Sequence, residues 1–211
     1  MKVLLINGSP NQKGCTYTAL TEVSETLKKE GIETEIFWIG KKPISGCIAC
    51  GNCAKSPKCV FDDAVNECRQ KAKDFDGFIF GSPVYYASAN GSMISFMDRL
   101  FFSDMYINNS QTFRFKPAAC VVSARRSGTT ATFDQLNKYL TISEMPVVAS
   151  RYWNMVHGLT AEDVLKDEEG LFTMRVLAKN MAYMLKCKEA ATKAGILPPE
   201  KEEGPYTNFI R

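Results

Sequence analysis

The sequence predicts an α/β fold in which a five-stranded parallel sheet carries helices on both faces. Three observations support this prediction. Short apolar runs alternate along the chain with longer segments whose apolar residues recur at helical spacing. Five apolar runs separated by helices are typical of a parallel sheet that is covered on both sides. The chain of 211 residues is also long enough for one domain with a complete hydrophobic core.

The first part of the chain predicts two strands with a helix between them. Lys2–Ile6 is dominated by apolar residues, as expected for a strand that is buried on both faces. Residues 16–30 are predicted to be helical, because their apolar side chains form one stripe and Gly31 can end the helix. Residues 33–39 form the second predicted strand, and a cysteine-rich loop follows it.

The rest of the chain continues the alternation of strands and helices. Residues 62–74 are predicted to be helical with Asp62 as the N-cap, because a carboxylate accepts a free N–H of the first turn. Pro146 suits the residue before a strand. The remaining predicted elements are a strand at 76–82, a helix at 90–101, an irregular insertion at 103–116, a strand at 118–123, a helix at 129–140, a strand at 147–152 and a helix at 168–194.

We expect residues 1–195 to form one domain and residues 196–211 to form a C-terminal tail. The tail contains prolines and charged residues, so it is not predicted to be a packed element on its own. Its Tyr206, Phe209 and Ile210 are candidates for contact with a neighbouring subunit, the alternative being a disordered end.

The composition makes several functional classes improbable. The formal charge of +3 is too small to favour nucleic acid or an anionic membrane as a partner. No apolar run approaches the length of a membrane span, and the N-terminal run is shorter than a signal-peptide core. We therefore expect a cytoplasmic protein with reduced thiols. This expectation disfavours disulfides and favours metal binding or redox chemistry.

The loop after the first strand is a candidate phosphate site, because ligands of such sheets bind at the carboxyl ends of the strands. The loop leads directly into a helix, whose free N–H groups and dipole favour an anion. It has neither the Walker A motif nor the glycine pattern of dinucleotide-binding folds. A mononucleotide phosphate site and an ordinary polar loop with a capping Thr both remain open.

The loops after the third and fourth strands extend this candidate site. Tyr85 and Tyr86 follow Pro83, and a rigid turn of this kind can lie against a planar ring. Alternatively, the two tyrosines close the end of the core. Arg125 and Arg126 could bind phosphate or stabilise negative charge on a reduced ring, or they could be solvated surface charges. Together the three loops suit a flavin mononucleotide.

Four segments carry a resemblance to a known family. They are GSPNQKGCT at 8–16, the C-x2-C-x2-C-x5-C run, SPVYYASANGSMISFMDR at 82–99 and the loop after the fourth strand. With them the chain resembles the flavodoxin-like NAD(P)H-dependent FMN reductases, and within these the iron–sulfur flavoproteins. The resemblance implies a doubly wound, flavodoxin-like sheet. It also implies an oxidoreductase that passes reducing equivalents from NAD(P)H through FMN to a small-molecule or protein acceptor. The resemblance further implies that the protein forms a homodimer or homotetramer.

The resemblance also implies which residues contact FMN, and it requires no side chain as an acid or base, so we predict no catalytic residue. The implied contacts are Ser9, Asn11, Gly14, Cys15 and Thr16 at the phosphate, Pro83, Val84, Tyr85 and Tyr86 at the ring, and Ser123, Ala124 and Arg125 nearby. Many relatives have Arg where Asn11 stands and Asn where Cys15 stands. The phosphate then lacks a bidentate partner, which could lower the affinity for FMN.

Cys47, Cys50, Cys53 and Cys59 form the cysteine run. Bacterial ferredoxins use the C-x2-C-x2-C spacing for three ligands of an iron–sulfur cluster. The resemblance implies that Cys59 supplies the fourth ligand of a [4Fe–4S] cluster. Structural zinc normally uses two separated pairs, so zinc is less favoured. The alternative that stays open is a set of thiols without a cluster.

The other cysteines and the single histidine have simpler interpretations. Cys15 lies at a helix N-terminus, which tends to lower a thiol pKa. Cys68, Cys120 and Cys187 are expected to be small core residues, and His157 is expected to be structural. Two rival functions remain: an electron carrier that contains FMN and a [4Fe–4S] cluster, and a flavodoxin-fold binding module without flavin.

Overall fold

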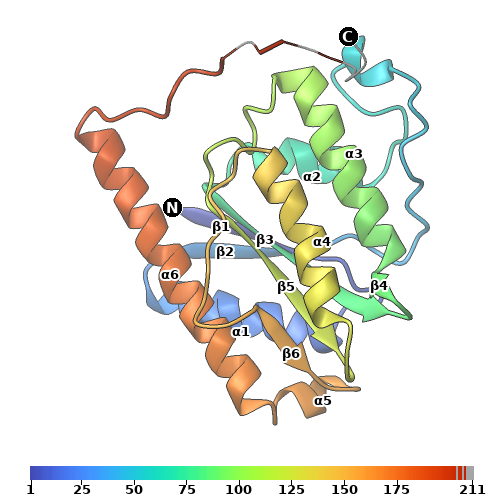
Figure 1. The fold of residues 1–211 in the computed structure, drawn as a ribbon, viewed down its shortest axis with the longest axis vertical. Helices are drawn as coiled ribbons and strands as arrows, with labels where there is room; N and C mark the ends of the chain where they lie inside the picture. Colours follow the sequence, from blue (N-terminus) through green and yellow to red (C-terminus); the bar gives the residue numbers. More distant parts are fainter. Residues whose placement is uncertain (203, 206, 208–211) are drawn as a thin grey trace.

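The computed structural model describes residues 1–202, 204, 205 and 207, and it confirms the predicted fold class (Figure 1). Five strands form a parallel sheet in the order β2-β1-β3-β5-β6, and the short β4 pairs with the end of β3 in the antiparallel sense. The strands are β1 (Lys2–Asn7), β2 (Glu33–Trp38), β3 (Gly77–Tyr85), β4 (Ser88–Ala89), β5 (Ala118–Ala124) and β6 (Met155–His157).

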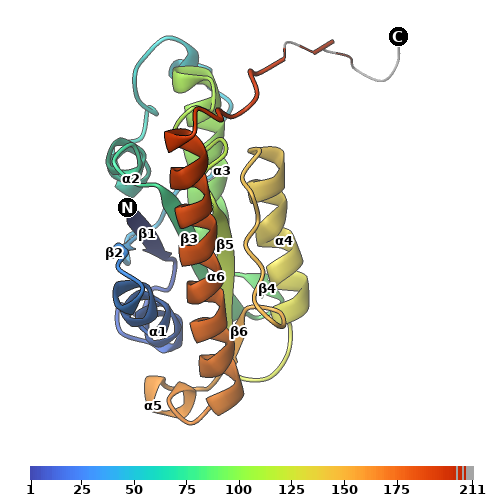
Figure 2. The ribbon, with the colours of Figure 1, turned by 90° about the vertical axis from the view of Figure 1, so that its left-hand side faces the viewer.

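Helices cover both faces of this sheet. They are α1 (Cys15–Lys29), the 3-10 helix η1 (Asn52–Ala54), α2 (Ala64–Ala72), α3 (Gly91–Asn108), α4 (Thr129–Ile142), α5 (Ala161–Val164) and α6 (Glu168–Lys193). Neighbouring residues of β1 face opposite sides: Val3 and Leu5 join the core with α1 and α6, whereas Leu4 and Ile6 join the core with α2, α3 and α4. Figure 2 shows α6 running along the molecule in front of the sheet.

The fifth parallel strand does not lie where the sequence predicts it. The prediction is 147–152, but β6 is Met155–His157, and Val147 makes only an isolated bridge to Ala118. The Ser150 hydroxyl accepts a hydrogen bond from Tyr152 N at 3.3 Å, so this segment forms a local turn instead of continuing the ladder. His157 is therefore the last residue of the strand and does not follow it.

Helices α2 and α3 also differ from the prediction. Asp63, and not Asp62, is the N-cap of α2, because its Oδ1 accepts a hydrogen bond from Val65 N at 3.1 Å. Helix α3 continues through Asn108, so the first part of the predicted insertion at 103–116 is helical. The helix ends where Asn109 adopts the left-handed conformation that asparagine tolerates well.

The first residues of the tail contact the body of the same chain. Arg114 Nη1 donates to the Pro199 carbonyl at 2.9 Å, and Lys201 Nζ donates to Asn109 Oδ1 at 2.7 Å. The candidate subunit contact through Tyr206, Phe209 and Ile210 involves residues outside the described part of the chain, and it stays a prediction. No helix in the described residues has the length and apolar character of a membrane span.

Candidate functional site

A cavity of about 180 Å³ lies at the carboxyl ends of β1, β3 and β5. Ten of the twelve predicted flavin-contacting residues line it: Ser9, Asn11, Cys15, Thr16, Pro83, Val84, Tyr85, Ser123, Ala124 and Arg125. Gly14 lines an adjoining hollow of about 500 Å³, which shares Asn11, Cys15 and Leu159 with the cavity. Tyr86 lines neither hollow.

The loop after β1 is shaped by its own side chains. Asn7 Oδ1 accepts a hydrogen bond from Ser9 N at 3.1 Å, and Ser9 Oγ accepts one from Asn11 N at 3.1 Å. Gly8 packs so closely on β3 that an added Cβ would lie 2.8 Å from the Gly81 carbonyl oxygen. These contacts turn the chain sharply from β1 toward α1.

The N-terminus of α1 is open toward a ligand. Its N-cap is Gly14, and no side chain forms a capping hydrogen bond there. The N–H groups of the first turn therefore have no side-chain cap and can donate to an anion, which the helix dipole also favours. Behind this turn the hydroxyls of Thr16 and Ser123 lie 2.8 Å apart and connect α1 to β5. The start of α1 thus offers the backbone donors that a phosphate would need, and the phosphate site stays a prediction.

The turn after β3 holds Tyr85 and Tyr86 in different positions. Asn90 N donates to the Pro83 carbonyl at 3.2 Å and to Ser82 Oγ at 3.1 Å, which closes a short hairpin through β4. Tyr86 occupies the tip of this hairpin with a positive φ of 56°, and its side chain is fully exposed. Burial raises the pKa of Tyr85, whose side chain lines the cavity.

The sequence prediction misses two residues of this cavity, Gly158 and Leu159. They directly follow β6, and because the fifth strand is predicted at 147–152, the prediction does not put them at the end of a strand. A strand predicted at 155–157 would have placed both at the carboxyl edge of the sheet. Of the two arginines after β5, only Arg125 lines the cavity. Arg125 has no ion-pair partner in the described part of the chain, so its charge is free to meet an anion.

Two expectations for the cysteines outside the run are wrong. Burial raises the pKa of Cys15, and the nearby carboxylates of Asp163 and Glu162 raise it further, so the predicted lowering by the helix N-terminus does not prevail. Cys187 is exposed on α6 and is not a core residue. Cys68 and Cys120 are buried, as predicted.

A second, small cavity of about 20 Å³ brings the four cysteines of the run together. We call residues 45–61 the cysteine loop. All four thiols are free, with Cys47 and Cys50 exposed and Cys53 and Cys59 half-buried. Burial raises the pKa of Cys53, and its three neighbouring thiols add to the effect. Across the described residues, no three His, Cys, Asp or Glu side chains are grouped so that they could hold a metal ion.

Because the cysteine loop follows the second strand, the sequence places it at the same carboxyl edge as the other ligand loops, but it does not lie there. Its cavity is lined from α3 by Arg99, Phe102 and Ser103, and it shares no lining residue with the cavity after β1. After β2 the chain runs back along α3, toward the end of α3 that is far from the carboxyl edge (Figure 1). The two sites are therefore separate within one chain.

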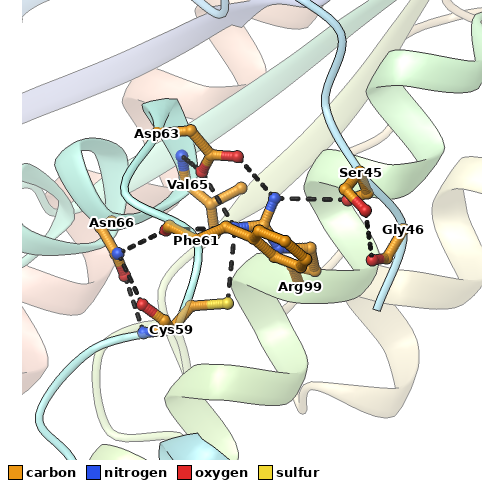
Figure 3. A network of polar contacts seen from close by, with 8 residues as sticks. All are labelled: Ser45, Gly46, Cys59, Phe61, Asp63, Val65, Asn66 and Arg99. Carbon is orange, nitrogen blue, oxygen red and sulfur yellow. Dashed lines mark hydrogen bonds and ion pairs between the residues drawn. The ribbon is translucent and has the colours of Figure 1, made fainter. Parts of the chain in front are cut away.

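Arg99 connects the cysteine loop to two helices (Figure 3). Its Nη1 lies 2.6 Å from Asp63 Oδ2, and its Nη2 donates to Asp63 Oδ1 at 3.0 Å. Nη2 also donates to Cys59 Sγ at 3.4 Å, and the guanidinium lies over the Phe61 ring at 4.7 Å. Burial alone would lower the pKa of Arg99, but the hydrogen bonds to Asp63 and Cys59 outweigh it, and the pKa is raised.

Asn66 fixes the backbone at the end of the loop. Its Oδ1 accepts from Cys59 N at 2.9 Å, and its Nδ2 donates to the carbonyls of Cys59 at 3.0 Å and Phe61 at 2.8 Å (Figure 3). One donor of the network stays unused: Arg99 Nε is buried and has no hydrogen-bond partner among the described residues. The cysteine cavity thus has a buried cation among its lining residues.

Comparison with known proteins identifies relatives along most of the chain. Residues 1–160 match the family model described as NADPH-dependent FMN reductase. The chain is 32% identical over 191 residues to an iron-sulfur flavoprotein of Methanocaldococcus jannaschii, covering 88% of this chain and 98% of the relative. It is 26% identical over 189 residues to an iron-sulfur flavoprotein of Methanosarcina thermophila, covering 88% and 95%.

Solved structures with low sequence identity share the fold. RosB has a TM-score of 0.69 and 15% identity, with 100% of this chain and 94% of RosB covered. An archaeal flavodoxin has a TM-score of 0.59 and 14% identity, with 88% and 99% covered. These likenesses support the flavodoxin-like architecture.

Proposed function

The chain belongs to the NADPH-dependent FMN reductase family, and from this premise we propose that it takes reducing equivalents from NAD(P)H through FMN and passes them to a small-molecule or protein acceptor. One observation carries the proposal. Ten residues expected to contact the flavin come from three separate loops and line one cavity. Ligands of this fold usually bind at the carboxyl edge of the sheet, which is where these loops meet.

The residues in the cavity fit a flavin phosphate. The α1 N-terminus offers N–H groups without a side-chain cap, and Ser9 and Thr16 add hydroxyls beside them. Asn11 cannot form the bidentate ion pair that an arginine would form with the phosphate, so the phosphate depends mainly on backbone donors here.

The other side of the cavity suits a planar ring. The backbone from Pro83 to Tyr85 forms a rigid wall, because β4 and Asn90 brace it from behind. When bound, FMN would supply the redox chemistry, which is to accept a hydride from the nicotinamide and to pass the electrons to the acceptor. Protein side chains do not provide this chemistry. The chain contributes position and polarity: Tyr85 covers one side, and Arg125 favours negative charge near the ring.

Anaerobic mixing of FMN-loaded protein with NADH or NADPH tests this proposal. We expect rapid loss of the visible flavin absorbance with at least one of the two nicotinamides. A protein that binds FMN but is reduced by neither would contradict the reductase proposal and favour an electron carrier. A protein that takes up no FMN would favour a binding module.

The cysteine loop favours a second candidate, an electron carrier that contains FMN and a [4Fe–4S] cluster. In such a cluster each cysteine binds a different iron, so the four sulfurs need not converge on one point. Four thiols around one cavity fit this requirement, and the Arg99 cation that lines the cavity fits a negatively charged group there. Cys47, Cys50, Cys53 and Cys59 would hold the cluster. Rapid reduction by a nicotinamide together with an absence of iron would exclude the carrier.

A further inference from the structure

We propose that Arg99 is the positioning residue of the cysteine loop. Its guanidinium fixes Cys59 through a hydrogen bond to the sulfur, and the Asp63 carboxylate holds the guanidinium in place. The inference rests on the second candidate function only where a cluster is measured. Its other readout uses the protein without metal.

The charge of Arg99 is buried. The side chain is only 1% exposed, and an isolated charge in such a place is costly unless it is paired and hydrogen-bonded. Asp63 provides a bidentate partner, with both of its oxygens bonded to the two terminal nitrogens. Because Asp63 is also the N-cap of α2, this pair locks α2 to α3 beside the loop.

The Arg99 guanidinium forms hydrogen bonds with both ends of the cysteine loop. Nη1 donates to the Ser45 carbonyl at 3.3 Å, where the loop begins. Nη2 donates to the Phe61 carbonyl at 3.4 Å, where the loop ends. Figure 3 shows Ser45 and Phe61 on opposite sides of Arg99. A lysine could replace the charge, but a single ammonium cannot reproduce this planar fork.

Arg99 also contacts a cysteine sulfur of the loop. Nη2 lies 3.4 Å from Cys59 Sγ, and Cys59 is the thiol furthest along the chain from the other three. A donor aimed at a ligand sulfur orients that ligand, and at an iron–sulfur cluster it also raises the reduction potential. If Arg99 only formed an ion pair between α2 and α3, its substitution would change stability but not the orientation of the Cys59 sulfur.

The test compares Arg99→Lys and Asp63→Asn with Arg114→Lys as a matched control. Arg114 also forms an ion pair, with Glu144 at 2.7 Å, but it belongs to a different network. Trypsin cleavage of the metal-free protein after Lys55 and Lys58 reports opening of the loop. We expect cleavage to be about tenfold faster in both test variants, the effect of losing one charge-assisted hydrogen bond, and unchanged in Arg114→Lys.

Anaerobically iron-loaded protein provides the second readout. We expect Arg99→Lys to retain less iron and to have a lower cluster reduction potential than the wild type, with FMN content unchanged. Wild-type cleavage rates in both test variants would overturn the proposal. Faster cleavage with an unaltered potential would overturn the sulfur contact.

Two controls keep the result interpretable. Far-UV circular dichroism establishes that each variant is folded, and Asp63→Asn, which keeps an N-cap residue, carries the test if Arg99→Lys is unfolded. If the wild-type protein holds no iron, the cluster candidate fails, and the trypsin comparison alone decides the role of Arg99.

Discussion

At Cys15 two physical effects act in opposite directions on one thiol. The N-terminus of α1 favours the thiolate, whereas burial and the carboxylates of Glu162 and Asp163 favour the neutral thiol. The thiol also donates to the Gly158 carbonyl, with sulfur and oxygen 3.5 Å apart. The result is a raised pKa, so at neutral pH the Cys15 thiol is protonated. It lines the cavity and does not act as a nucleophile.

We therefore predict that iodoacetamide alkylates Cys15 more slowly than the exposed Cys187 at neutral pH. Because the thiolate is the reactive form, the rate at Cys15 should rise as the pH increases toward its raised pKa. Mass spectrometry of peptides from the native protein gives both rates, with Cys15→Ser as the assignment control. Equal rates at neutral pH would contradict this account of Cys15.

Asp63 performs two tasks that a substitution can separate. Asn keeps the N-cap function but removes the charge that pairs with Arg99. Because a buried arginine is then left without its counter-ion, we predict that Asp63→Asn lowers the free energy of unfolding by about 3 kcal/mol. Urea unfolding monitored by circular dichroism measures the loss.

The neighbouring Asp62 provides the control for this measurement. It is exposed, so Asp62→Asn should change the unfolding free energy by less than about 0.5 kcal/mol. Equal effects of the two substitutions would show that general surface charge, and not the pair with Arg99, stabilises this region.

At the level of elements, local sequence patterns locate most of the fold but not its long-range choices. The strands β1, β2, β3 and β5 and the helices α1, α2, α3, α4 and α6 follow the predicted order, because buried strands and amphipathic helices have distinctive periodicity, whereas the short η1 and α5 are not predicted. The fifth strand is misplaced because two short segments compete for the same neighbour. Met155–His157 pairs with the end of β5, and Asn154 anchors it by donating to the Cys120 carbonyl at 3.1 Å.

In the candidate sites, too, local sequence patterns locate the contiguous features but not those that depend on long-range contacts. The loop after β1 is identifiable because its loop-to-helix pattern is contiguous in the sequence. Arg99 is not, because its partners Asp63 and Cys59 are 36 and 40 residues away and only the fold brings them together. The position of the cysteine loop along α3 likewise depends on tertiary packing, which no spacing of cysteines encodes.

The cysteine loop carries its own prediction. If it binds a [4Fe–4S] cluster, anaerobically purified wild-type protein should contain about four irons per chain. Cys50→Ala should lose this iron together with the broad visible absorbance and keep the flavin bands. Iron and acid-labile sulfide assays measure the loss, and Cys187→Ala on α6 is the matched control. Only flavin bands in the wild-type protein would exclude the cluster.

At the scale of the whole molecule, the two cavities belong to different parts of the fold. One lies at the carboxyl edge of the sheet, and the other lies along α3 beyond Arg99, with no lining residue in common. Flavin binding should therefore be independent of the four cysteines of the cysteine loop. This separation makes it possible to test the flavin site by itself.

The most direct test of the account is an equilibrium titration with FMN, followed by the quenching of flavin fluorescence. Ala124 ends β5 and lines the carboxyl-edge cavity, so Ala124→Phe should fill space that the flavin needs. We predict that the wild type and Cys50→Ala bind FMN equally, and that Ala124→Phe binds at least about tenfold more weakly, a difference of about 1.4 kcal/mol. FMN binding by folded Ala124→Phe with wild-type affinity would contradict the claim that this cavity is the flavin site.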